Sequence, residues 1–249
     1  MGLDDARSLL YHGVLDARAL ALVWLLSDGG VPLVVAGPAA AEKRRALAVA
    51  LLSLDPARPW VILDVDADGD AIDAERLAAL LRGGSALGLT VGADDLEAAI
   101  ERLVALGLPE DGVRRLGVVV VAAEAPGGLR CAVVHYLRPT ERDAQRHVQR
   151  RPPAVLAAWD EREDTFEDYA WGITPELADR VGRSQADLEE RRADRARFLA
   201  SLADDERPYG ERVATYLATE PAPEPAPPRP DAEPSPFSGG LLDADGHDH

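Results

Sequence analysis

The fold of this chain follows from the stretch LVVAGPAAAEKRRAL at residues 33–47. Its first four residues are all apolar, which predicts a short strand buried on both faces. Gly37 and Pro38 then predict a turn, and the alanine-rich, charged segment that follows predicts a helix over 41–54. A buried strand, a glycine turn and a helix make up the repeating unit of a parallel α/β sheet.

The neighbouring segments repeat this unit. Leucine-rich residues 4–28 predict two helices before the first strand, and further strands alternate with helices after it. We expect strands at 31–36, 60–63, 86–91 and 117–122, and helices at 41–54, 73–82 and 94–106, the last one capped by Asp94. This alternation indicates an α/β fold with a mainly parallel sheet flanked by helices.

The character of the sequence changes after residue 125. A Pro-Gly-Gly turn and a charged turn at 160–164 predict two β-hairpins, over 117–137 and 154–170, and three helices are expected after them. From Glu220 onward the chain is rich in proline and acidic residues, which predicts disorder. We divide the chain into an α/β domain at 1–137, a β-hairpin extension at 138–172, a helical segment at 173–219 and a disordered acidic tail at 220–249.

Composition excludes several classes of function. The net charge is -17 over 249 residues, and such an acidic surface disfavours sequence-independent binding of nucleic acid. Cys131 is the only cysteine, so no internal disulfide can form, and its apolar neighbours predict a buried structural thiol. The longest apolar run, residues 19–26, is too short to span a bilayer, and the N-terminus lacks a basic region. We therefore expect a cytoplasmic protein without a transmembrane segment.

Residues 37–44 follow the layout of the phosphate-binding motif G-x-x-x-x-G-K-[ST]. Gly37 takes the place of the first glycine, and Lys43, the only lysine in the chain, takes the place of the motif's lysine. Glu42 replaces the second glycine, and its carboxylate at about 4 Å from a phosphate costs about 4 kcal/mol at an effective dielectric of about 20. Arg44 replaces the hydroxyl residue and has no oxygen to offer to Mg²⁺.

The chain resembles the type II and type IV secretion ATPase superfamily, which powers pilus and secretion machines as ring hexamers. The similarity covers roughly residues 10–137 and includes GVL at 13–15, PLVVAGP at 32–38 and LGLTVGADDLEAAIERL at 87–103. The last of these is similar to the histidine box of that family. The resemblance implies a P-loop NTPase-like sheet that binds ATP through Gly37, Lys43, Arg44 and Asp64, with self-assembly into oligomers. Asp64 would stand in for the Walker B carboxylate, and the alternative is a solvated aspartate at a strand end.

The departures from the family pattern fall on residues needed for catalysis. Besides Glu42 and Arg44, Gly92 replaces the histidine of the histidine box, and no strand carries a clear Walker B glutamate. We expect no catalytic residues, and a protein that binds nucleotide weakly or acts as a non-catalytic accessory subunit. Its partner would be an intact secretion or pilus ATPase or the membrane platform of that machine. An active but divergent ATPase is the alternative.

Residues 64–75 also match the EF-hand calcium loop D-x-D-x-D-G-x₅-E. A strand precedes this loop where an EF-hand has a helix, and the chain offers no partner loop. A calcium-binding module is therefore a third reading, beside an acidic loop that only caps the next helix. The cofactor expected first is ATP, with Mg²⁺ and Ca²⁺ both disfavoured. The acids at the ligand positions of the motif are Asp64, Asp66, Asp68 and Glu75.

Overall fold

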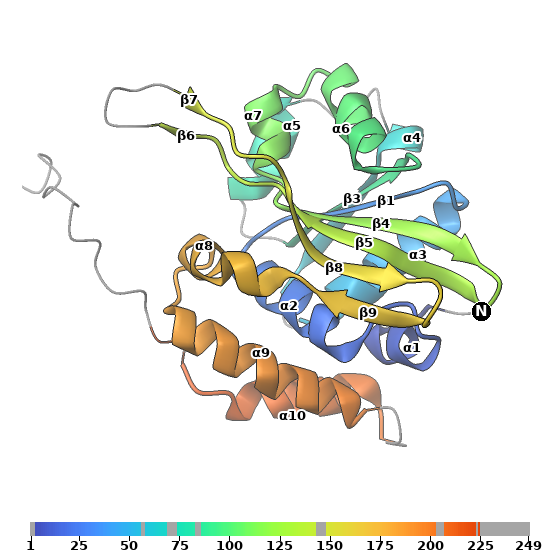
Figure 1. The fold of residues 1–249 in the computed structure, drawn as a ribbon, viewed down its shortest axis with the longest axis vertical. Helices are drawn as coiled ribbons and strands as arrows, with labels where there is room; N and C mark the ends of the chain where they lie inside the picture. Colours follow the sequence, from blue (N-terminus) through green and yellow to red (C-terminus); the bar gives the residue numbers. More distant parts are fainter. Residues whose placement is uncertain are drawn as a thin grey trace, which may run out of the picture.

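A twisted seven-stranded sheet runs through the centre of the molecule (Figure 1). The computed structural model describes residues 3–55, 58–68, 74–82, 86–142, 148–202, 207–222 and 224. Within these residues the strand order is β2-β3-β1-β4-β5-β8-β9. The first four strands are parallel to one another, and the last three are added antiparallel. The strands are β1 (Leu33–Gly37), β2 (Trp60–Asp64), β3 (Ala86–Gly92), β4 (Val118–Ala125), β5 (Gly128–Tyr136), β8 (Ala154–Asp160) and β9 (Thr165–Asp168). The fold class is therefore α/β with a mixed sheet.

Strand β1 lies in the middle of the parallel part and is buried along its whole length. Val35 is in register with Thr90 of β3 on one side and with Val120 of β4 on the other. Because side chains alternate along a strand, Val35 belongs to the core on one face of the sheet and Val34 to the core on the opposite face. This double burial explains why the strand is apolar without alternation.

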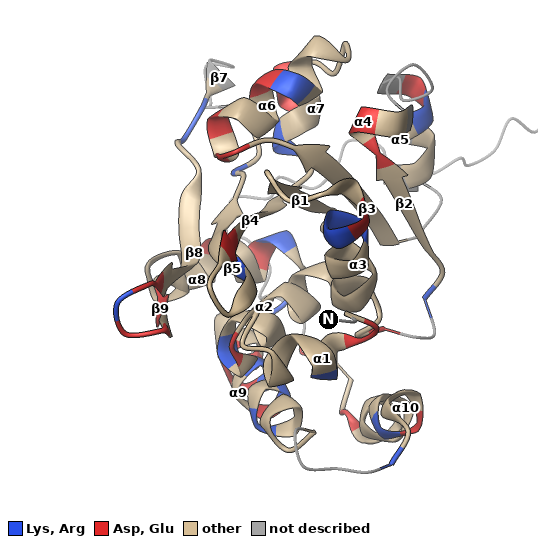
Figure 2. Ribbon diagram, turned by 90° about the vertical axis from the view of Figure 1, so that its right-hand side faces the viewer, with Lys and Arg blue, Asp and Glu red and all other residues tan. Residues whose placement is uncertain are grey.

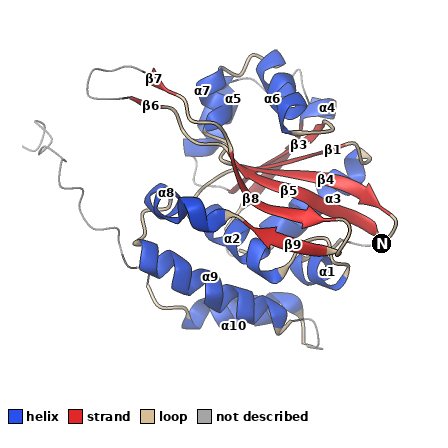
Figure 3. Ribbon diagram, in the orientation of Figure 1, coloured by secondary structure: helices blue, strands red, loops and turns tan. Residues whose placement is uncertain are grey.

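Helices cover both faces of the sheet (Figure 3). One face packs against α1, α2, α3, α8, α9 and α10, and the other against α4, α5, α6 and α7. The helices are α1 (Ala6–Tyr11), α2 (Ala17–Asp28), α3 (Ala41–Leu52), α4 (Val65–Asp68), α5 (Ala74–Arg82), α6 (Leu96–Ala105), α7 (Glu110–Arg114), α8 (Thr174–Arg180), α9 (Gln185–Ala200) and α10 (Tyr209–Thr219), with a 3₁₀ turn η2 at Ala170–Ile173.

The C-terminal segments share the sheet and the core with the rest of the chain. Strand β8 pairs with β5 and carries β9, and α9 packs along α2. Aromatic rings join the helices: Trp24 of α2 lies 6.2 Å from Phe198 of α9 and 5.7 Å from Tyr216 of α10, measured between ring centroids. The predicted hairpins and the three predicted C-terminal helices are all present.

Several local predictions need correction. The cap of α6 is Asp95 rather than Asp94, because the Asp95 carboxylate accepts a hydrogen bond of 2.8 Å from the Ala98 amide. The short helices α4 and α7 were not predicted, since one or two turns give too few residues for a helical period. Two short strands that the sequence did not predict, β6 (Glu141–Arg142) and β7 (Val148–Gln149), lie between the two hairpins.

Cys131 confirms the expectation of a structural thiol. The side chain is fully buried on β5, and burial raises the pKa of the thiol to about 12. Of the predicted disordered tail at 220–249, residue 223 and residues 225–249 lie outside the described residues, as does the middle of the proposed calcium loop, residues 69–73. Among the residues that are described, none of the helices is both long and apolar enough to cross a membrane.

Candidate functional site

The connections of the parallel strands place a topological switch point, where open α/β sheets form their ligand crevices, at the carboxyl ends of β1 and β3. The chain leaves β1 toward α3 on one face, whereas it leaves the neighbouring β3 toward α6 on the opposite face. In open α/β sheets, ligands bind outside the carboxyl ends of the strands at such a switch point. Figure 2 shows the basic residues at the start of α3 beside these strand ends. Gly37 ends β1 here and Gly92 ends β3.

A cluster of charged side chains lies at this switch point, with Arg44 buried and its partners partly exposed. The Asp66 carboxylate on α4 forms ion pairs with Arg44 of α3 and, at 2.6 Å, with Arg102 of α6. The same carboxylate accepts a hydrogen bond of 2.8 Å from the Gly92 amide. Arg102 also donates to the Gly92 carbonyl at 2.8 Å. We call Arg44, Asp66, Gly92 and Arg102 the crevice cluster; it joins four elements that are distant in sequence.

Arg44 is the deepest member of the crevice cluster. Its side chain is only 6% exposed, and its guanidinium donates to the carbonyl oxygens of Gly37, at 3.4 Å, and Ala39. Within the part of the chain that the structure describes, its Nε has no hydrogen-bond partner. A permanent cation therefore lies across the loop at the position where the phosphate-binding motif carries an Mg²⁺-binding hydroxyl.

Gly92 allows the crevice cluster to close. A Cβ atom at this position would lie 2.8 Å from Asp66 Oδ2 and 3.4 Å from Arg44 Nη1. The first distance is shorter than real Cβ contacts, so any side chain here would displace the Asp66 carboxylate. The crevice cluster in this form therefore requires glycine at position 92.

Asp64 and Asp66 do different work at the end of β2. The Asp64 side chain accepts a hydrogen bond of 3.0 Å from the Asp66 amide, and Asp64 itself is buried. This bond holds the first turn of α4, which in turn presents Asp66 to the two arginines. The residue chosen from the sequence as a Walker B substitute thus supports the site through its neighbour.

Lys43 lies on the other side of β1. Its Nζ donates to Glu124 Oε1 of β4 at 2.6 Å, and both side chains are more than half exposed. Strand β4 neighbours β1 opposite to β3, so the Lys43 ammonium is engaged away from the crevice cluster. Glu42 is exposed in the first turn of α3, where its charge is favourable to the helix N-terminus.

The first half of the proposed calcium loop is helical and makes contacts within the protein. Residues 65–68 form α4, and both oxygens of Asp66 are held by the crevice cluster. Asp68 ends α4 and Glu75 is exposed in the first turn of α5. In the described ranges, no three histidine, cysteine or acidic side chains gather in a way that could hold a metal ion.

Two features of the site were not predicted from the sequence. One is the ion pairing of Asp66 with the two arginines, and the other is the presence of Arg102 in the site. Asp66 had been singled out only as a calcium ligand. Arg102 lies in the segment that resembles the histidine box, where a single arginine on an amphipathic helix gives no distinguishing signal. Both roles depend on strand order, which brings β2, β3 and β1 side by side.

No protein-family model matches the chain. A search of curated proteins finds no match either. The likeness to secretion ATPases rests on the sequence pattern of residues 10–137 alone.

Proposed function

We propose that this chain is a non-catalytic relative of the secretion and pilus ATPases that works as an accessory subunit beside an intact ATPase. The observation that carries the proposal is the position of Arg44. A phosphate-binding loop keeps its interior open for the nucleotide and Mg²⁺. Here a buried guanidinium lies against the loop carbonyls and is neutralised by Asp66 from the same chain.

Hydrolysis would require groups that the site lacks. Phosphoryl transfer depends on Mg²⁺ bridging the phosphates and on donors held around them. Arg44 cannot bind Mg²⁺, and Asp66, the acid nearest to it, is occupied by two cations. Glu42 adds a negative charge at the start of α3. We infer that ATP is not turned over.

Weak anion binding is still compatible with this arrangement. The cap residue of α3 is Ala40, which makes no side-chain hydrogen bond to the helix N-terminus. Backbone N–H groups at a helix N-terminus attract anions. Nucleotide bound there would depend little on Lys43, because the Lys43 ammonium is turned to Glu124.

The test is a comparison of ATP binding and Mg²⁺-dependent phosphate release in the wild type, Lys43→Ala and Arg45→Ala. Arg45 is the matched control, since it is the next exposed cation on α3. We expect no phosphate release, and the same weak binding in both variants. Micromolar binding that Lys43→Ala alone abolishes would instead support the active, divergent ATPase.

The accessory role needs a separate experiment. The tagged full chain is used to recover partners from the cells that encode it, and the partners are identified by mass spectrometry. We expect a protein with an intact G-x-x-x-x-G-K-[ST] motif, or a membrane component of a secretion or pilus machine, among them. A reproducible set of partners with neither would count against this role.

A further inference from the structure

We propose that Arg44, Arg102 and the Gly92 amide form an anion-binding site whose resident ligand is the chain's own Asp66. An external phosphate group takes this site when Asp66 is withdrawn. The inference rests on the proposed function in one respect, namely that Asp66 occupies the site in the protein without ligand.

The donors around Asp66 have the geometry of an oxyanion site. They come from α3, β3 and α6, and they converge on both oxygens of one carboxylate. Guanidinium groups match carboxylate and phosphate oxygens equally well, because their N–H groups form a rigid fork. Two guanidinium charges face one carboxylate, so the crevice cluster is left with a net positive charge. A phosphate dianion would neutralise it.

Burial makes some anion obligatory at this position. The Arg44 side chain, which ends in a guanidinium cation, is 6% exposed. An unpaired charge at that depth is strongly unfavourable. The site is nevertheless open to solvent from one side, since the Arg102 side chain is 51% exposed and that of Asp66 is 26% exposed.

Asp66 can be withdrawn by a rotation of its own side chain, although α4 itself is held to the sheet by the buried Val65. Helix α4 is a single turn that follows β2, the edge strand of the sheet. Asp66 is joined to the rest of the cluster only through its carboxylate, and to β2 through the Asp64 hydrogen bond. Arg44 and Arg102 belong to longer helices packed on opposite faces of the sheet, so they would stay in place.

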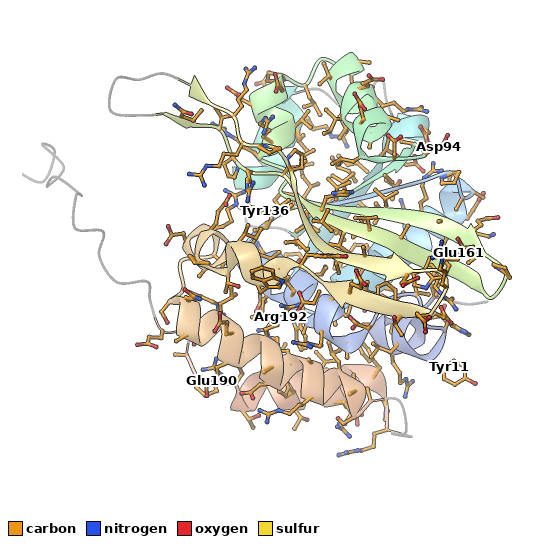
Figure 4. All side chains as sticks on the ribbon, viewed as in Figure 1. Tyr11, Asp94, Tyr136, Glu161, Glu190 and Arg192 are labelled. Atoms are coloured by element: carbon orange, nitrogen blue, oxygen red, sulfur yellow. The ribbon has the colours of Figure 1, made fainter. Side chains whose placement is uncertain are left out.

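The experiment measures the melting temperature against inorganic phosphate for the wild type, Asp66→Asn and Asp66→Ala. Asp94→Ala is the matched control, because Asp94, labelled in Figure 4, is an exposed carboxylate shortly after the end of β3 and is not a member of the crevice cluster. We expect phosphate to stabilise both Asp66 variants by binding the folded state. The apparent affinity of both variants for phosphate should exceed that of the wild type by about 100-fold. This factor is the lower end of the advantage that tethering gives to an internal ligand such as Asp66.

Two further arms complete the design. Adding Arg102→Gln to Asp66→Asn should abolish the phosphate effect. ADP in place of inorganic phosphate distinguishes a nucleotide from free phosphate as the source of the anion. The proposal is overturned if phosphate stabilises neither Asp66 variant, and this includes the case in which neither variant folds with or without phosphate. It is also overturned if phosphate stabilises Asp94→Ala as strongly as the Asp66 variants. These outcomes leave the proposed function intact, because that depends on ATP turnover by the wild type.

Discussion

Arg44 brings a permanent charge into the interior, and Asp66 is the carboxylate that compensates it. Removing one partner of such a pair is worse than removing the charge itself, because the remaining ion stays desolvated. The pair is therefore asymmetric: Arg44→Met leaves Asp66 with Arg102 and the Gly92 amide, whereas Asp66→Asn leaves Arg44 without an anion.

We predict that Asp66→Asn lowers the free energy of unfolding by about 2–4 kcal/mol, somewhat less than the loss for a fully buried pair. The discount reflects the exposure of Asp66, whose side chain is 26% accessible. Arg44→Met should cost less than Asp66→Asn. Urea unfolding of both variants and of the double variant measures the difference. Equal losses for the two single variants would contradict the asymmetry.

His135 gives the chain a pH-dependent term at the residue scale. It lies on β5 between Val119 and Val155 of the adjoining strands, and burial lowers its pKa below the ordinary value of 6.5. The unfolded chain then binds more protons than the folded chain as the pH falls below 6.5. The contribution of His135 is present above that pH and is lost as the pH falls.

We therefore predict that His135→Gln reduces the acid sensitivity of the fold. The wild type should lose stability relative to the variant between about pH 7 and about pH 5, the range around the ordinary histidine pKa. Unfolding free energies of both proteins across this range give the difference directly. A difference that does not change with pH would mean that His135 keeps its ordinary pKa.

At the scale of elements, helices and strands could be predicted where the residues at their own ends and along their length form a recognisable pattern. Strand β1 and helix α3 were predicted because apolar runs, glycine and proline mark their limits within a few residues. The cap of α6 was placed one residue early, because two adjacent aspartates offer the same chemistry and only the backbone conformation distinguishes them. The cap of α9 likewise depends on a distant residue: the Ser184 hydroxyl accepts from the Asp187 amide, while the Ser184 amide donates to the Glu224 carbonyl.

The candidate site was predicted only in part for a related reason. Gly37, Lys43, Arg44 and Asp64 follow a local motif and could be found along the chain. The pairing of Arg44 with Asp66 spans 22 residues and that of Asp66 with Arg102 spans 36. Such pairs exist only because β3 lies between β1 and β2, and strand order is not written in any local pattern.

Helices α2, α9 and α10 are held together by a second buried arginine. The Arg195 side chain is 0% exposed, and its Nη2 lies 2.6 Å from Asp28 and 2.7 Å from Glu220. Its guanidinium also lies 4.2 Å from the ring centroid of Trp24. Either carboxylate alone can compensate the charge of Arg195. The stability losses caused by removing the two carboxylates should therefore be strongly non-additive.

We predict that Asp28→Asn and Glu220→Gln each cost about 1–2 kcal/mol, and that the double variant costs about 4–6 kcal/mol because it leaves a buried charge unpaired. A double-mutant cycle by urea unfolding checks this. Arg192→Gln serves as the control, since Arg192 is on the same helix and pairs with Asp168 instead. Additive losses would show that only one of the two carboxylates compensates Arg195.

At the scale of the whole molecule, residues 1–137 do not cover all of their own apolar surface. Strand β5 needs β8 along its outer edge, and α2 needs α9 and α10 over Trp24. On the face of the sheet that α2 and α9 cover, one hydrophobic core extends from Leu9 in α1 to Val213 in α10. The later segments are thus part of the same folded unit, as Figure 1 shows for β8, β9 and α9.

We predict that a chain ending at residue 137 does not fold, whereas a chain ending at residue 224 keeps the melting temperature of the full protein. Uncovering a large apolar side chain costs roughly 1.5–3 kcal/mol, and domains are stable by only about 5–15 kcal/mol. Trp24 and a few neighbours would exhaust that margin, in addition to the hydrogen bonds that β5 loses. Circular dichroism and thermal unfolding of both truncated chains provide the measurement. Cooperative unfolding of the shorter chain would show that residues 1–137 form an independent domain and that α9 and α10 are only attached to it.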